Sequence, residues 1–583
     1  MSALFLVRTA DPSFAAEAEV TARRQWARHG FTEPSAFDLA GWRLLHVPPI
    51  QGGPESLLVE GDDLVAVAGT PVVDGLMGRE ALRRLLSAAA LPAPDWRRIT
   101  GHFVAVVRSG GRTLLFTDYH GVFQLFHDTQ ERVFSTSLLA ALGVLPRVSF
   151  DTQGVYEWAF GVVTTGDGTV FSELKMLGPD RAVELTHEGA VSHAMRKPLT
   201  PPETERLPVE EMIARNTAQV MRVAEAQVRQ FGDAIHCPLS AGMDSRLMLG
   251  ALRAAGAKPH VYVYGPPGGE DVRIARAIGA AEGFHVEWTD KQAAPIAPDA
   301  FAEQVERNFH GWDGLLNFGN LFDNGVNAQE WRARHAGGAL AVSGGGGEVY
   351  RDFFMLPDRP VSAMTLARCF NSRFIASDAT ALFHPKRYVE RIADKIAAAL
   401  ESHDRNEPLS RQRIEQAFPR VRLRALFRWE VNSEARQGPY TMFFLDHLLT
   451  AEAMKLPTPL KQAGRFQGRM INAVDPALAR HLSGYGHDFT GPPGWRYRIV
   501  EAATRYRPLP LREHAYAIHR WRGRMEDEHG GLLSPEYMGR VVDLTFPVMR
   551  RFFNVDRITD GGLWRRIACL EYLSAWLGTR LAS

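Results

Sequence analysis

Cysteine is scarce in this chain, with three residues among 583. Cys237, Cys369 and Cys569 are widely separated, so they match neither the spacing of a metal site nor a disulfide framework. Each is interpreted as a small buried hydrophobic residue in a reducing compartment. A disulfide scaffold and a cysteine-ligated metal site are therefore excluded.

The chain also lacks an excess of charge of either sign and a long apolar segment. It has 67 Lys and Arg against 66 Asp and Glu, so no overall field attracts it to nucleic acid or an anionic membrane. The apolar run within residues 1–8 is too short for a signal peptide or a transmembrane helix. We expect a cytoplasmic protein without nucleic-acid or membrane partners, and the sequence leaves its oligomeric state open.

The length and composition favour more than one domain, since apolar residues make up 45% of a 583-residue chain. Residues 1–197 contain short β-branched and aromatic runs separated by turns, with one helix expected over 79–89. Residues 198–210, rich in proline and glutamate, are predicted to be a linker. Residues 211–583 begin with alternating helix and strand patterns, which favour a doubly wound parallel sheet. From about residue 490 we expect a helical extension packed on this second domain.

The most informative segment is 237–251, where an apolar run ends in a small-residue turn and opens onto a helical pattern. Backbone N–H groups at such a turn, the positive end of the helix and the Ser240 and Ser245 hydroxyls suit a phosphate chain. Asp244 suits that anion only if a divalent cation lies between them. Small-residue turns and N-capping Ser or Asp are common, so this turn alone leaves nucleotide binding open.

Two later segments follow the same strand-and-loop pattern. Residues 259–265 are predicted to be a buried strand, followed by a helix over 271–282. Residues 338–343 are predicted to be a strand leading into four consecutive glycines, 344–347. Four glycines cost conformational entropy, which suits a backbone that approaches a ligand closely, although a flexible surface loop is the alternative. In a doubly wound sheet such loops follow the carboxyl ends of strands, where ligands bind.

These motifs resemble the asparagine synthetase-like enzymes of the ATP pyrophosphatase superfamily. Residues 240–245 are similar to its Ser-Gly-Gly-x-Asp-Ser loop, with Ala241 in place of one glycine. Residues 341–350 resemble its Gly-Asp-Gly-Gly-Asp-Glu segment, in which only Glu348 remains acidic. Weaker similarities cover the family's glutaminase strands and the helices after its acidic loop; they lie at 99–107, 118–126, 134–138, 443–447, 456–457 and 468–471.

The resemblance, over about residues 95–190 and 205–475, implies the fold class. We expect an α+β sandwich of the N-terminal-nucleophile (Ntn) hydrolase type, followed by an α/β doubly wound ATP-pyrophosphatase domain. In the family the glutaminase uses an N-terminal cysteine, whereas this chain has Ser2 there. It also has residues 67–70 where the family has Asn-Gly-Glu. The first domain is therefore predicted not to hydrolyse glutamine.

The resemblance also implies ATP and Mg²⁺ as cofactors and assigns the site residues. Asp244 and Glu348 would be the metal ligands, and Arg469 takes the place of a charge-stabilising lysine. The family's acceptor-side glutamate falls near Pro439, which leaves Tyr440 and Glu434 as catalytic candidates. The implied ATP-binding residues are Leu239, Ser240, Ala241, Gly242, Asp244, Ser245, Val263, Tyr264, Gly265, Gly345, Gly346 and Gly347.

The favoured hypothesis is an ATP-dependent, AMP-forming amide ligase. It would activate the carboxylate of a small molecule or peptide as an acyl-adenylate for attack by ammonia or an amine. One alternative is a macrolactam cyclase of the lasso-peptide type, with a precursor peptide or a biosynthetic partner protein. Asparagine synthase is disfavoured by Ser2 and Pro439. From a different class comes an inactive nucleotide-binding scaffold, favoured by the glycines that replace acidic residues at 344–347.

Overall fold

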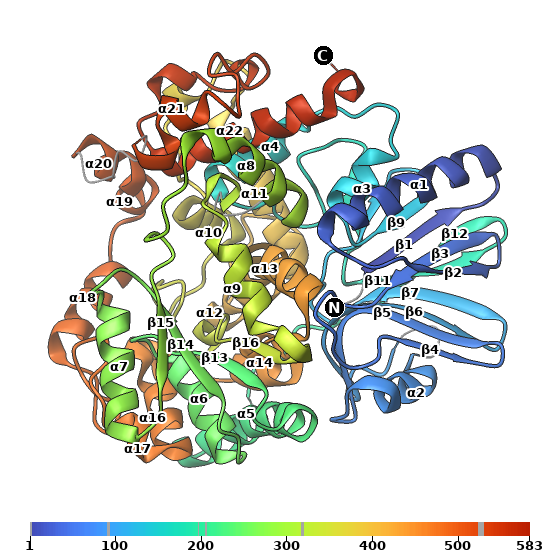
Figure 1. Cartoon of the computed structure of the whole chain (residues 1–583). Coiled ribbons are helices and arrows are strands. Elements are labelled where there is room, and N and C mark those ends of the chain that lie inside the picture. Colours follow the sequence, from blue (N-terminus) through green and yellow to red (C-terminus); the bar gives the residue numbers. More distant parts are fainter. Residues whose placement is uncertain are drawn as a thin grey trace.

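The computed structural model describes residues 3–89, 94–195, 197–203, 207–315, 320–522 and 530–582. In these residues two antiparallel sheets form the N-terminal half, and a parallel sheet surrounded by helices follows (Figure 1). This is the expected division into an α+β and an α/β part. Within the same residues, no helix combines the length and apolar character needed to cross a bilayer.

The N-terminal half has four layers, with helices on the outer faces of two stacked sheets. Its elements are β1 (Ala3–Arg8), α1 (Pro12–His29), β2 (Ser35–Leu39), β3 (Trp42–Val47), β4 (Leu57–Glu60), β5 (Asp63–Val73), α2 (Gly78–Ala88), β6 (Ile99–Ser109), β7 (Arg112–Thr117), β8 (Phe126–Asp128), β9 (Val133–Ser135), α3 (Leu138–Gly143), α4 (Thr152–Gly161), β10 (Leu174–Met176), β11 (Arg181–Thr186) and β12 (Gly189–Ala194). One sheet has the order β10-β8-β9-β1-β3-β2 and the other β12-β11-β7-β6-β5-β4.

Strand alternation explains these layers. Leu4 and Leu6 of β1 belong to the core between the sheets, whereas Phe5 packs with Trp26 of α1 in a separate outer core. In the second sheet Phe103 of β6 packs towards α2 in the same way. Because successive side chains point to opposite faces, a strand that is apolar at every position requires a cover on both sides.

The second half is built on the parallel strands β13 (Ile235–Pro238), β14 (His260–Tyr264), β15 (Val286–Thr289), β16 (Leu340–Ser343) and β17 (Tyr440–Met442). Their order in the sheet is β15-β14-β13-β16-β17. From β13 the chain moves outward to β14 and β15, then returns to the other side of β13 for β16 and β17. The direction of winding therefore reverses between β13 and β16, where α/β sheets form a ligand crevice beyond the carboxyl ends of the strands.

Helices cover both faces of this sheet (Figure 1). The α-helices and one π-helix are α5 (Val209–Phe231), α6 (Asp244–Ala254), α7 (Glu270–Glu282), α8 (Pro298–Gly311), α9 (Val326–Arg334), α10 (Ala363–Phe370), α11 (Pro385–Ala399), α12 (Arg411–Glu415), the π-helix η5 (Phe418–Leu423), α13 (Arg424–Gln437), α14 (His447–Met454), α15 (Thr458–Lys461), α16 (Arg465–Val474) and α17 (Pro476–Ala479). Short 3₁₀ turns are η1 (Asn320–Phe322), η2 (Ala336–Gly338), η3 (Gly347–Tyr350), η4 (Ala376–Asp378), η6 (Phe443–Leu445) and η7 (Gln462–Gly464).

The linker predicted over 198–210 overlaps α5, which already begins at Val209. Thr200 is held by Gln416, whose side chain accepts from the Thr200 N–H at 2.8 Å and donates to its carbonyl at 2.8 Å. This part of the connection is therefore fixed against the second half.

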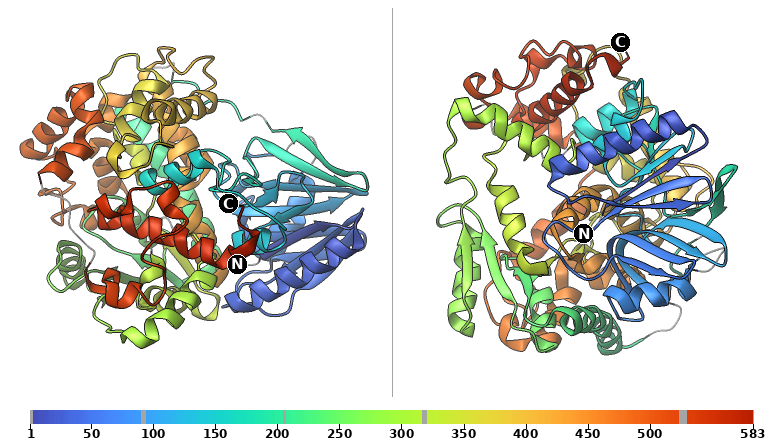
Figure 2. Two further views of the ribbon diagram at one scale, coloured as in Figure 1. Left: turned by 90° about the horizontal axis from the view of Figure 1, so that it is seen from above. Right: turned by 45° about the vertical axis from the view of Figure 1, so that its right-hand side comes forward.

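The C-terminal extension contacts both halves, rather than the second domain alone as expected. It contains α18 (Trp495–Arg505), α19 (Leu509–Glu513), α20 (Ala515–Trp521), η8 (Gly531–Leu533), α21 (Pro535–Met538), η9 (Met549–Arg551), η10 (Val555–Arg557), α22 (Gly561–Leu577) and η11 (Gly578–Arg580). Arg566 of α22 donates to the Ala159 carbonyl at 2.6 Å, and Arg580 donates to the Leu142 carbonyl at 3.1 Å. Figure 2 shows α22 lying against the N-terminal half.

A buried carboxylate also joins the halves. Asp313, which follows α8, accepts hydrogen bonds from the Ser137 hydroxyl at 2.6 Å and from the Leu139 N–H at 3.1 Å, at the start of α3. Its second oxygen pairs with Arg436 at 3.0 Å. A residue of the second half thus caps a helix of the first, and Arg436 compensates the buried charge.

Candidate functional site

The loop between β13 and α6 is shaped by its own hydroxyl groups. The Ser245 hydroxyl accepts from the Ser240 N–H at 3.0 Å and lies 3.0 Å from the Ser240 hydroxyl. The Gly242 N–H donates to Ser240 Oγ at 3.2 Å, and the Ala241 N–H donates to Asp271 at 2.7 Å. No side chain caps the start of α6. The loop is thus preformed, and the positive end of α6 lacks a side-chain acceptor.

The glycine loop after β16 packs directly on this turn. A Cβ on Gly344 would lie 3.1 Å from the Ser245 nitrogen, and one on Gly347 would lie 2.3 Å from Asp244 Oδ1. Gly346 has a φ of +91°, a backbone conformation that residues with a Cβ rarely adopt. Gly345 lies beside Phe427. The absence of side chains at the four glycines therefore allows the two loops to touch. This contact accounts for the entropic cost of the glycines, so a flexible surface loop is not needed to explain them.

Their contact brings Asp244 and Glu348 together around Arg351. Arg351 donates to Asp244 Oδ2 at 2.7 Å and lies 3.6 Å from Glu348 Oε1. Gln467 donates to Asp244 Oδ1 at 2.7 Å, and the Tyr485 hydroxyl accepts from Arg351 at 2.9 Å. Desolvation and the neighbouring Asp244 carboxylate raise the pKa of Glu348. The turn and the glycine loop thus form one charged cluster.

Two of these carboxylates fit a divalent cation that also binds phosphate. Glu348 Oε2 is buried and has no hydrogen-bond partner among the described residues. Mg²⁺ commonly takes one or two protein carboxylates plus phosphate oxygens. The described residues contain no group of three or more His, Cys, Asp and Glu arranged to hold a metal. Asp244 and Glu348 therefore fit Mg²⁺ together with a polyphosphate, and the ion would displace Arg351 from Asp244 Oδ2.

Arg469, the predicted charge-stabilising residue, contacts a residue outside this cluster. Arg469 and Gln467 both lie on α16, but two residues along a helix correspond to about 200° of rotation. Gln467 faces Asp244, whereas Arg469 pairs with Glu210 at 2.9 Å and is 48% exposed. The positive charge at the cluster is that of Arg351, three residues after Glu348. Arg351 was not identified from the sequence. Its position directly after the turn that follows the glycine loop was the available signal.

Tyr440 forms a second pair one strand away. Its phenol donates to Glu430 Oε1 at 2.6 Å. The Ser343 hydroxyl, directly before the glycine loop, interacts with the same carboxyl. Desolvation raises the pKa of Glu430 to about 7. A carboxyl with this pKa can accept a proton near neutral pH. Glu430 was not singled out in the sequence because it lies ten residues from Tyr440, on α13.

Glu434, the other acceptor-side candidate, is engaged elsewhere. Burial raises its pKa to about 8 and lowers that of His335 to about 3. The Glu434 carboxyl and His335 Nε2 lie 3.0 Å apart and share a hydrogen bond. His335 precedes β16, and this bond joins α13 to the segment entering the sheet.

The residues predicted to flank adenine lie at the same edge of the sheet. Val263 is buried in β14, and the Tyr264 hydroxyl donates to Glu330 at 3.2 Å. The Lys291 ammonium lies 3.5 Å from the centre of the Tyr264 ring. The following Gly265 accepts from Trp288 at 2.9 Å. The Lys291 cation thus covers one face of the Tyr264 ring.

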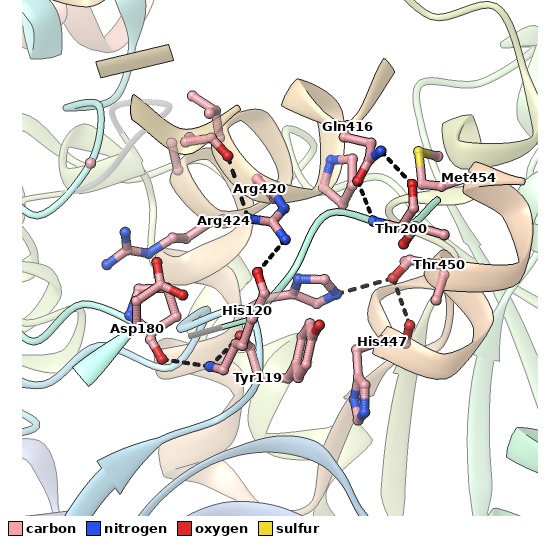
Figure 3. Close-up of a pocket in the computed structure, with 18 of the residues that line it drawn as sticks. Tyr119, His120, Asp180, Thr200, Gln416, Arg420, Arg424, His447, Thr450 and Met454 are labelled. Atoms are coloured by element: carbon pink, nitrogen blue, oxygen red, sulfur yellow. Dashed lines mark hydrogen bonds between the residues drawn. The ribbon is translucent and has the colours of Figure 1, made fainter. Parts of the chain in front are cut away.

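A cavity of about 120 Å³ lies between the two halves (Figure 3). Lys197 donates to the Tyr119 carbonyl at 2.7 Å and to the Pro179 carbonyl at 2.5 Å. His120 lies 3.2 Å from the Thr450 hydroxyl. The Lys197 bonds thus stay within the first half, whereas the contact between His120 and Thr450 crosses to the second half.

The region of the predicted inactive glutaminase also faces the second half. Thr70 accepts from the Tyr440 N–H at 3.3 Å, and His102 donates to the Met442 carbonyl at 3.1 Å. Ser2 lies outside the described residues. Loss of glutaminase activity therefore stays a prediction.

No protein-family model matches the chain, and no curated protein matches it. Among solved structures, it is similar to the allosteric regulatory enzyme of purine biosynthesis, with a TM-score of 0.23 and 10% identity over 51% of this chain and 67% of that one. It is also similar to glutamine phosphoribosylpyrophosphate amidotransferase from B. subtilis, a structure with ADP and GMP, at a TM-score of 0.24 and 10% identity over 45% and 81%. Likenesses at this level say nothing of the activity of this chain.

Proposed function

We propose that the protein is an ATP-dependent, AMP-forming amide ligase that activates a substrate carboxylate. The observation that carries this proposal is the convergence of Asp244 and Glu348 from two loops at the point where the parallel sheet reverses its winding. That position suits a phosphorylated ligand, and the uncapped start of α6 would receive phosphate oxygens. The resemblance of both loops to the ATP pyrophosphatases supports ATP as this ligand.

In the first step a carboxylate oxygen of the substrate would attack the α-phosphorus of ATP. The new P–O bond forms as the bond to the β-phosphate bridge breaks, which gives an acyl-adenylate and pyrophosphate. Asp244 and Glu348 would hold Mg²⁺, which supplies charge neutralisation at the polyphosphate. Arg351, released from Asp244, would be free to donate to phosphate oxygens.

In the second step ammonia or an amine would attack the acyl carbon and AMP would leave. The attacking nitrogen must lose a proton as the amide forms. The Tyr440–Glu430 pair lies beside the glycine loop, and the pKa of Glu430 of about 7 suits it to accept that proton. Glu434, bonded to His335, would position α13 and its Glu430.

The test is release of pyrophosphate from ATP in the presence of a panel of carboxylic acids. We expect release that depends on one class of acid and on Mg²⁺, with loss of at least about a hundred-fold in the Asp244→Asn variant. The exposed Asp358→Asn variant serves as the matched control and should retain the wild-type rate. Pyrophosphate release that is unchanged in Asp244→Asn would exclude the metal assignment.

One observation favours a second candidate, a nucleotide-binding scaffold without turnover. Arg351 already neutralises Asp244, and the amides of Ser240, Ala241 and Gly242 are bonded within the protein. A scaffold would bind ATP, detected by calorimetry, but would release no pyrophosphate with any carboxylate in the panel.

A further inference from the structure

A cavity of about 970 Å³ lies between the helices of the second half and the C-terminal extension. This is at the upper end of the range of about 300–1,000 Å³ typical of pockets for drug-sized ligands. Three parts of the chain line it. Gly161 ends α4 of the N-terminal half, Leu366 and Ile392 lie on α10 and α11, and Arg512 and Arg565 belong to the extension.

One side of the cavity is apolar. Phe353 packs against Phe418 with ring centres 4.4 Å apart, and Phe354 packs against Phe370 at 5.1 Å. Leu366 adds an aliphatic surface. Such walls bind an apolar molecule by removing its surface from water, at about 25 cal/mol per Å².

The cavity is also lined by positively charged side chains that have no carboxylate partner among the described residues. Arg373, Arg422, Arg512 and Arg565 line the cavity, and none forms an ion pair with a carboxylate among the described residues. Arg512 donates only to backbone carbonyls. The one acidic residue in the lining, Asp560, accepts from the Tyr516 hydroxyl and caps α22. Guanidinium groups in an apolar surround are suited to carboxylate recognition.

Two buried polar atoms in the lining also lack partners in the part of the chain that the structure describes. They are Ser372 Oγ and Arg565 Nε. Unpaired buried donors and acceptors cost about 1–3 kcal/mol each, so they are expected to be satisfied by something that enters the cavity. The presence of these two unpaired atoms favours a polar ligand over a purely hydrocarbon one.

The cavity adjoins the Asp244–Glu348 cluster. Arg422 interacts electrostatically with Glu348, and Phe353 lies two residues after Arg351. Leu423, the neighbour of Arg422, lies 3.5 Å from the position of a Cβ on Gly346. The π-helix η5 therefore contacts the glycine loop through Leu423 and lines the cavity through Arg422, and π-helical turns often occur at functional sites.

We infer that this cavity binds the acyl substrate, and that the substrate is an amphipathic carboxylic acid with an apolar body and a second anionic group. The inference rests on the proposed ligase activity. Arg422 orients the reacting carboxylate beside the glycine loop, and the arginines of the extension receive the second anion. The extension thereby acquires a role in substrate selection, because α19 and α22 supply part of the wall.

The test measures binding of decanedioate and decanoate to the full chain by calorimetry, without ATP. We expect decanedioate to bind about five-fold more tightly or better, since each extra ion pair contributes about 1 kcal/mol. Arg422→Gln and Arg565→Gln should remove this preference, and Leu366→Trp should weaken both acids by filling the cavity. The exposed Arg359→Gln variant is the control, and thermal unfolding establishes that each variant is folded.

Equal affinity for the two acids, no binding of either, or wild-type binding by Leu366→Trp would overturn the inference. Pyrophosphate release separates this failure from failure of the ligase proposal. Release with compact acids that is unaffected by Leu366→Trp retains the ligase and removes the cavity from it. Selective binding of decanedioate without pyrophosphate release for any acid would retain the binding site and exclude the ligase.

Discussion

Arg351 donates a 2.7 Å hydrogen bond to Asp244, the carboxylate at the start of α6. The same guanidinium lies 3.6 Å from Glu348, so one cation is shared by the two carboxylates that would bind Mg²⁺. The like charges of Asp244 and Glu348 would otherwise repel each other in a partly desolvated site. The ion pair therefore stabilises the cluster, and under the proposed function it would be exchanged on binding of metal and polyphosphate.

The Arg351→Gln variant is expected to depend on Mg²⁺ for stability more than the wild type does. Without the guanidinium the cluster should lose about 1–3 kcal/mol of unfolding free energy, and magnesium pyrophosphate should restore part of it. Thermal unfolding with and without magnesium pyrophosphate measures this difference, with Arg359→Gln as control. An equal response of both variants to the metal would contradict the shared-cation role.

The Gly347→Ala variant should fold but lose turnover. Its Cβ would lie 2.3 Å from Asp244 Oδ1, so the carboxylate must move away from Arg351 and Glu348. We expect a loss of pyrophosphate release of at least about ten-fold, because misplacement by about an ångström is costly in catalysis. The exposed Gly491→Ala, which like Gly347 lies outside the positive-φ region but has no atom within 4 Å of its Cβ, controls for the replacement of a glycine itself. Comparable losses in both variants would show that crowding at Asp244 is not the cause.

Amide formation should rise with pH through about 7 if Glu430 accepts the proton. Its raised pKa means that the carboxyl is protonated, and therefore inactive as a base, below this range. Glu430→Gln should lose this limb of the pH profile, whereas pyrophosphate release in the first step should change little. Tyr440→Phe, which removes the hydrogen bond at 2.6 Å, should shift the midpoint upward because the bond favours the charged carboxylate. A Glu430→Gln profile identical to that of the wild type would exclude the assignment.

Glu434 should make stability fall as pH rises. Its pKa is about 8 in the folded protein and close to 4.5 in the unfolded chain. The folded state therefore binds the extra proton between these values, and its contribution is complete below about pH 4.5 and lost as pH rises through about 8. Glu434→Gln, which stays neutral, should flatten this dependence in denaturant unfolding between pH 5 and 9. The same slope in wild type and variant would contradict the buried neutral carboxyl.

Removal of the Asp313 carboxylate should weaken the contact between the halves. Asp313→Ala leaves Arg436 buried without its partner and removes the acceptor of the Leu139 N–H at the start of α3, with an expected loss of about 3–5 kcal/mol. The double variant Asp313→Ala/Arg436→Met should recover part of this loss, since it no longer buries an unpaired charge. Chemical unfolding measures both. Additive losses in the double variant would show that the two groups act independently.

The sequence predicted the loops of the site better than its side-chain partners. The turn at 240–245 and the glycines at 344–347 were assigned to the carboxyl ends of strands, because short-range patterns of apolar and small residues report local backbone geometry. Arg351, Gln467 and Glu430 were not identified, since each reaches the site from a helix or turn whose facing depends on packing. The catalytic role of Arg469 stays a prediction, and in the structure this side chain pairs with Glu210, because the sequence motif does not establish which side of α16 faces Asp244.

By itself, the sequence determined that the chain has an antiparallel, strand-rich part and a part built on alternating strands and helices. Alternation of apolar residues and small-residue turns is sufficient for this, since both act within a few residues. Only the tertiary structure decided that β16 lies next to β13, that Arg351 is shared by Asp244 and Glu348, and that the C-terminal extension helps to enclose the large cavity. Apart from the neighbouring Glu348 and Arg351, these relationships join parts of the chain that are distant in sequence. They follow from burial and charge compensation across the whole chain, which no local pattern encodes.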